Sequence, residues 1–96
     1  MIDKNKAIEA IYAAIDELNA QLPADQHLQK SADTNLTGEK SPLDSLGLIN
    51  LLVAIEQEIS KLHGKDVQLL DENLLGEEGG PYRTVETLAD YTAQSA

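Results

Sequence analysis

Residues 45–62 read SLGLINLLVAIEQEISKL, and this stretch has the apolar spacing of an amphipathic helix. At about 100° per residue, five apolar side chains fall on one side and form the predicted core face: Leu48, Leu51, Leu52, Ile55 and Ile59. Four residues fall on the opposite face: Leu46, Asn50, Val53 and Gln57. Leu46 and Val53 are then either scattered surface residues, which are common, or a ridge that contacts a partner.

The chain before this helix predicts one more helix and a long loop. Residues 3–22 carry an apolar stripe at three- and four-residue steps: Ile8, Ile11, Tyr12, Ile15, Leu18 and Leu22. Asp3 is a suitable N-cap and Pro23 a stop signal. Residues 23–44 have no sustained period and predict a loop with a short turn of helix. We expect Leu28 and Leu36 to hold this loop to the core.

The chain after residue 62 predicts a short helix and a final helix. Gly64 stands where a helix C-cap belongs. A short helical segment is expected over residues 71–75 and a loop over 77–81. The last helix is expected from an N-cap at Thr84 to about Gln94. Its predicted core face is Val85, Leu88, Ala89 and either Tyr91 or Thr92.

No segment has a convincing strand pattern, so the sequence predicts an all-α fold in a single domain over residues 1–96. A chain of 96 residues suits one domain with one modest core.

Charge is the unusual feature of the composition. Asp and Glu total 17 against 7 Lys and Arg, a net charge of −10. Such a surface repels phosphate backbones, so we expect no nucleic-acid partner. It attracts basic patches on partner proteins, or it serves solubility alone. No apolar run approaches the ~20 residues that span a bilayer, and the N-terminus lacks a signal-peptide pattern. We therefore expect no membrane insertion and a cytoplasmic protein.

The sequence has few side chains in arrangements suited to conventional catalysis, so we expect no catalytic residues and no metal site. The chain has no Cys, which excludes thiolate nucleophiles and Cys-ligated metals. Asp44 and Ser45 are adjacent, so they cannot form a triad with His63 in which the carboxylate orients the base. The acidic residues Asp71, Glu72, Glu77 and Glu78 do not match a calcium-loop spacing and indicate a solvated charge run.

Ser45 stands where the loop becomes a helix. The macrodipole is positive at a helix N-terminus, so a phosphate ester on this hydroxyl would be stabilised. The plainer alternative is that Asp44 and Ser45 are an ordinary capping pair.

Residues 43–48, LDSLGL, followed by INLLVAIE at 49–56, resemble the Asp-Ser-Leu attachment motif and second helix of acyl carrier proteins. The first helix, the long loop, the short third segment and the closing TVETLADY helix at 84–91 follow the order of that family over nearly the whole chain. The resemblance implies a four-helix bundle of acyl-carrier type, with a long first loop and a short third helix.

The resemblance also implies a function. Ser45, flanked by Asp44 and Leu46, would receive 4′-phosphopantetheine from coenzyme A through a separate phosphopantetheinyl transferase. The arm would carry an acyl group as a thioester, and the chain would act as a monomer. Leu46 and Val53 match positions that contact partners in this family. The partners would be acyl-loading and acyl-accepting enzymes with basic patches.

This chain departs from the family at several positions. Pro42 stands where a Gly is common, and Gly47, Asn50 and Gln57 stand where carriers of fatty acid biosynthesis often have acidic residues. These differences favour a specialised lipid, glycolipid or secondary-metabolite pathway. Residues 43–47 are also similar to D-alanyl carrier proteins, so an aminoacyl carrier is one alternative. An unmodified acidic helical interaction module is the other.

Overall fold

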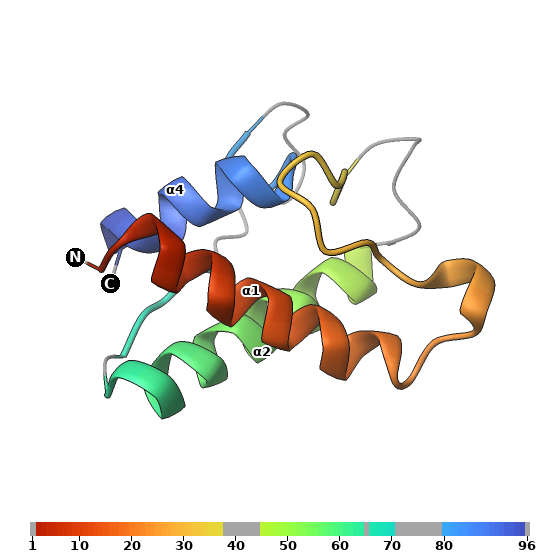
Figure 1. Cartoon of the computed structure of the whole chain (residues 1–96), viewed down its shortest axis with the longest axis horizontal. Coiled ribbons are helices and arrows are strands. Elements are labelled where there is room, and N and C mark those ends of the chain that lie inside the picture. Colours follow the sequence, from red (N-terminus) through yellow and green to blue (C-terminus); the bar gives the residue numbers. More distant parts are fainter. Residues whose placement is uncertain (1, 38–44, 65, 71–79, 96) are drawn as a thin grey trace.

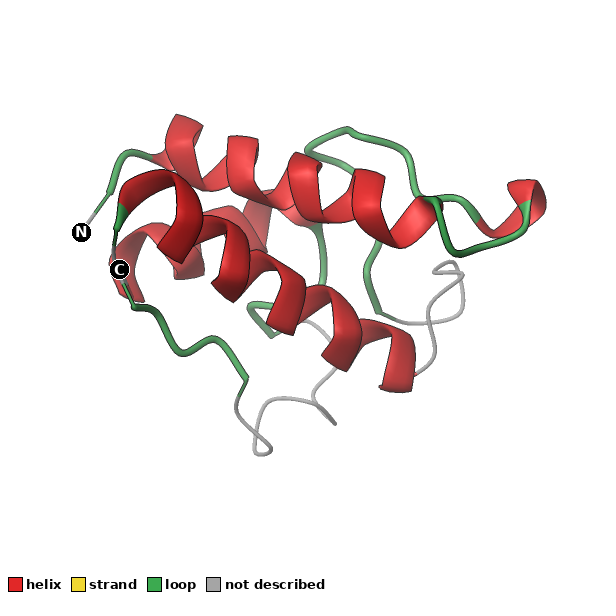
Figure 2. Ribbon diagram, turned by 90° about the horizontal axis from the view of Figure 1, so that it is seen from below, coloured by secondary structure: helices red, strands yellow, loops and turns green. Residues whose placement is uncertain are grey.

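The computed structural model describes residues 2–37, 45–64, 66–70 and 80–95, and within these residues the chain forms three α-helices (Figure 1). They are α1 (Lys4–Asn19), α2 (Ser45–His63) and α4 (Val85–Ser95), with a short 3₁₀ turn, η1 (Ala24–Gln26), after α1. The only bridge of strand type in the described residues is an isolated one between Asn35 and Thr84, and no strand is drawn in Figure 2. The prediction of an all-α fold is therefore confirmed.

Helix α1 packs against both α2 and α4. Figure 1 shows α2 running in the opposite direction to α1, and the two chain ends lying close together. The backbone N–H of Ile2 donates to the carbonyl of Ala93 at 3.2 Å, which joins the start of the chain to α4. None of the helices in the described residues combines the length and apolarity that crossing a membrane requires.

The buried face of α1 overlaps the predicted apolar stripe only in part. The buried residues are Ala7, Ala10, Ile11, Ala14 and Ile15. Of the predicted stripe, only Ile11 and Ile15 are fully buried, and Ile8, Tyr12 and Leu18 pack at the edge of the core. Alanines on the inner face allow close approach to two neighbouring helices, and the larger side chains fill the flanks.

The end of α1 also differs from the prediction, because the helix stops at Asn19 rather than Leu22. The Asn19 amide donates to the Leu28 carbonyl at 2.9 Å and accepts from the Leu28 N–H at 2.8 Å. Gln21 and Leu22 bond to the third residue before them, which closes the helix with a tighter turn. Asp3 occupies the N-cap position as predicted, but its side chain makes no capping hydrogen bond.

The long loop has the short helical turn that the sequence predicts, and Leu28 and Leu36 are buried. Its far end is bonded to the start of α4. The Val85 N–H donates to the Thr34 carbonyl at 3.1 Å, and the Leu36 N–H donates to the Arg83 carbonyl at 2.8 Å. The loop is thereby fixed at both ends of its described part.

The predicted core face of α2 is confirmed, since all five of its residues are buried. The helix extends one residue beyond the prediction, to His63, and then ends at Gly64. Gly64 has a φ of +64°, in the left-handed region that glycine adopts without strain, and its N–H donates to the Ser60 carbonyl at 3.0 Å.

Thr84 caps α4 as predicted, because its hydroxyl accepts from the Thr87 N–H at 3.2 Å. Val85, Leu88, Ala89 and Thr92 are buried, whereas Tyr91 is half-buried and meets Tyr82 edge to face. The buried Tyr82 hydroxyl donates to the Leu69 carbonyl. The expected short helix at 71–75 lies outside the described residues, as do residues 77–79 of the expected loop.

Candidate functional site

Ser45 is the first residue of α2, so the structure places it at the positive end of a 19-residue helix. The first turn of α2 contains no acidic residue that would repel a phosphate there. Asp44 and Pro42 lie outside the described residues. The role of Asp44 beside Ser45 therefore stays a prediction.

The outer face of α2 carries an exposed, uncharged ridge, defined by Leu46, Asn50, Val53 and Gln57. The structure brings these four residues onto one face, as the sequence predicts, and all of them are exposed. Leu46 exposes 65% of its surface and Val53 38%. Leu62 is also exposed, but it lies about 160° around the helix from Leu46 and is not part of the ridge.

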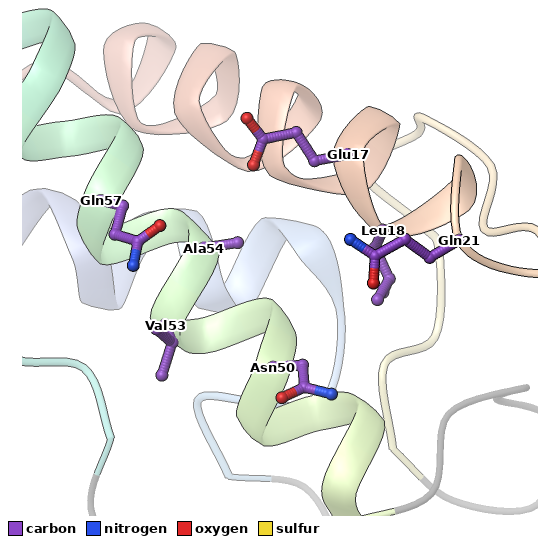
Figure 3. Close-up of a pocket in the computed structure, with 7 residues that line it drawn as sticks. All are labelled: Glu17, Leu18, Gln21, Asn50, Val53, Ala54 and Gln57. Carbon is purple, nitrogen blue, oxygen red and sulfur yellow. The ribbon is translucent and has the colours of Figure 1, made fainter.

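A groove of about 270 Å³ lies between the ridge and the C-terminal half of α1 (Figure 3). It is lined by Glu17, Leu18, Gln21, Asn50, Val53, Ala54 and Gln57. Glu17 belongs to α1 and Gln21 to the turn that follows it; in Figure 3 the Gln21 amide points toward α2, and the Glu17 side chain lies along α1. Sequence reasoning missed these two residues, because it treated each helix by itself and a groove depends on how two helices pack.

Glu58 is a buried carboxyl group at the same helix–helix interface, with only 6% of the residue exposed. Burial raises its pKa, and the Glu17 carboxyl, which is within hydrogen-bonding reach, raises it further. Lys61 lies 3.9 Å from Glu58 and lowers the pKa, but the lysine side chain is 71% exposed. Among the residues that the structure describes, Lys61 is thus the one cation within ion-pair distance of Glu58, and it is held loosely.

Glu56, also on α2, anchors a neighbouring segment of the chain. Its Oε2 accepts hydrogen bonds from the backbone N–H groups of Leu69, at 2.7 Å, and Leu70, at 3.2 Å. These charge-assisted bonds hold residues 66–70 against α2. The sequence offered no signal for this contact, because it joins residues 13 and 14 positions apart through a loop.

His63 is too far from Ser45 to act as its general base. His63 ends the helix that Ser45 begins, so their backbones are about 27 Å apart at 1.5 Å per residue. His63 does lie in the last turn of α2, where a helix dipole favours a positive charge. The His27 ring donates from Nε2 to the Leu22 carbonyl at 2.9 Å.

No cluster of three or more possible metal ligands occurs among the residues that the structure describes. The acidic residues Asp71, Glu72, Glu77 and Glu78 lie outside that part of the chain.

No family model, curated protein or solved structure matches this chain. The functional evidence is therefore the start of α2, the ridge and the groove beside it.

Proposed function

We propose that the chain is a carrier protein that holds acyl intermediates as thioesters on a 4′-phosphopantetheine arm attached to Ser45. One observation carries this proposal: Ser45 begins α2, and the same helix then exposes Leu46 and Val53 on its outer face. Leu46 and Val53 are about 10 Å apart along the helix axis. An enzyme that contacts both residues would thus reach the attachment point at the end of the ridge.

The start of α2 suits a phosphodiester. The positive end of the helix stabilises an anion, and the first turn offers no competing carboxylate. In the transfer, the Ser45 oxygen bonds to the phosphorus of the pantetheine phosphate in coenzyme A. The pyrophosphate bond breaks, adenosine 3′,5′-bisphosphate leaves with the electron pair, and the hydroxyl proton passes to the transferase. When attached, the arm supplies the terminal thiol that this chain, with no Cys, lacks.

The arrangement of the chain also supports a carrier. Three helices in the order α1, α2 and α4, with a long first connection, agree with a four-helix bundle of acyl-carrier type whose short third helix would be residues 71–75. The uncharged ridge favours partners other than the enzymes of housekeeping fatty-acid synthesis. We therefore infer a specialised lipid, glycolipid or secondary-metabolite pathway in the cytoplasm.

Incubation with coenzyme A and a broad-specificity phosphopantetheinyl transferase, followed by intact-mass measurement, tests the proposal. We expect wild type and the matched control Ser41→Ala to gain one phosphopantetheine, and Ser45→Ala to gain none while keeping its helical circular dichroism. Modification of Ser45→Ala would move the site elsewhere. Wild type that stays unmodified would favour the unmodified acidic interaction module.

A further inference from the structure

The groove between α1 and α2 has the lining of a site for a cation with many hydrogen-bond donors. Glu17 is the one charged residue among its seven lining residues, and none of the seven is basic. Three side-chain amides, from Gln21, Asn50 and Gln57, add carbonyl acceptors. Leu18, Val53 and Ala54 are the apolar residues of the lining.

The Glu58 carboxyl group, which interacts with Glu17 of the groove lining, has little opposite charge beside it. Glu17 lines the groove, and its carboxyl group is close enough to the almost fully buried Glu58 of α2 to raise the pKa of Glu58. The only cation within salt-bridge distance of Glu58 in the described residues is Lys61, at 3.9 Å and largely exposed. A second cation entering beside Glu17 would offset the repulsion between the two carboxyl groups.

We propose that this groove binds an arginine side chain of a partner protein, with the Glu17 carboxylate as its ion-pair partner. The guanidinium group has five donors in a planar fork and no acceptor, which suits a carboxylate surrounded by amide oxygens. Its methylene stem packs on the apolar residues of the lining. The net charge of −10 attracts a basic partner from a distance. This inference goes beyond the carrier function and does not depend on modification of Ser45.

The composition of this chain indicates that the arginine in the groove comes from a partner protein and not from a second copy of the chain. Arg83 is the chain's one arginine, and two copies would each carry a charge of −10. Repulsion between such copies disfavours self-association.

A titration of the full ¹⁵N-labelled chain with the capped tetrapeptide acetyl-Leu-Arg-Ala-Leu-amide tests the proposal. The control peptide has citrulline, a neutral isostere, in place of arginine. We expect the arginine peptide to shift the side-chain amide signals of Gln21, Asn50 and Gln57 saturably, and the citrulline peptide to leave them in place. Glu17→Gln should weaken binding about two- to fivefold, as expected for a partly exposed ion pair.

Glu9→Gln is the matched control, because Glu9 is exposed on the same helix and the change in charge is the same. Its effect on affinity should be clearly smaller than that of Glu17→Gln. Equal weakening by the two variants would overturn the proposal in favour of general electrostatic attraction. Two other results would also overturn it: no saturable shift of the three amides, or shifts that follow protein concentration without peptide, which would indicate a second copy.

Discussion

Glu56 and Glu58 are two residues apart on α2 but face different surroundings, because residues at that spacing are about 200° apart around a helix. Glu56 accepts two backbone hydrogen bonds and holds a neighbouring segment. Glu58 is buried beside another carboxyl group. The first side chain stabilises the fold through its charge, and the second destabilises it when charged.

Replacing Glu56 tests its role as an anchor. We expect Glu56→Ala to lower the free energy of unfolding by about 1–3 kcal/mol, because the N–H groups of Leu69 and Leu70 lose their acceptor. Glu56→Gln should recover part of the loss, since the amide oxygen can still accept. Chemical denaturation measures both, with the exposed Glu9→Ala as control. An equal loss in Glu56→Ala and Glu9→Ala would contradict the anchoring role.

Replacing Glu58 tests the buried carboxyl pair. The pKa of Glu58 is raised above the ordinary 4.5 by burial and by Glu17, so its stabilising contribution is complete below about pH 4.5 and is lost as the pH rises through the folded-state pKa. We expect Glu58→Gln to reduce the fall in Tm that accompanies a rise in pH above 4.5, because the amide does not ionise. Glu9→Gln, which removes one exposed charge, should reduce it less. The same reduction in both variants would indicate that the fall in Tm with pH depends on the net charge of the chain and not on the buried carboxyl pair.

The two long helices show what a sequence pattern can predict. On α2 the five core residues and the four exposed ones were all assigned correctly, because large aliphatic side chains mark one face without ambiguity. On α1 the pattern favoured the large residues, but the inner face is centred on Ala7, Ala10 and Ala14. Alanine gives a weak periodic signal, and its burial depends on how closely the neighbouring helices approach.

The residues of the candidate site also differ in how far the sequence predicts them. The ridge belongs to one helix, so its residues could be predicted from spacing on α2. The groove could not, because Glu17 and Gln21 join it only through the packing of α1 on α2. The contact of Glu56 with residues 69 and 70 likewise depends on the path of a loop, for which the sequence has no periodic signal.

Two substitutions on α2 test the assignment of its faces. Val53→Ala should change the free energy of unfolding by less than about 0.5 kcal/mol, because the side chain is exposed. Ile55→Ala should cost about 2–5 kcal/mol, because Ile55 is fully buried. If the chain is a carrier, Val53→Ala should also slow acyl transfer to its true partner enzyme. Unfolding of Val53→Ala would refute the assignment of the ridge.

The whole molecule carries ten net negative charges in 96 residues, and their mutual repulsion opposes the folded state. Lys4 and Lys30, for example, form exposed ion pairs with carboxylates at 3.2–3.4 Å. Such exposed pairs contribute little to the stability of the folded state. Repulsion should therefore dominate the response to salt.

We expect Tm to rise between low salt and about 0.2 M, where screening acts over roughly 8–10 Å. Differential scanning calorimetry at constant pH measures the change, and millimolar divalent cation should act in the same direction. A Tm that falls over this range would show that attractive ion pairs outweigh the repulsion.

The central claim is that Ser45 carries a phosphopantetheine arm, and the most direct test is the mass of the chain purified from its own cells. Tandem mass spectrometry of the intact protein should show the mass of the chain plus one phosphopantetheine, and fragmentation should release the arm and assign it to the peptide that contains Ser45. The same chain with Ser45→Ala, expressed in the same cells, should have the unmodified mass. An unmodified wild-type chain, or an arm on any other residue, would contradict the account.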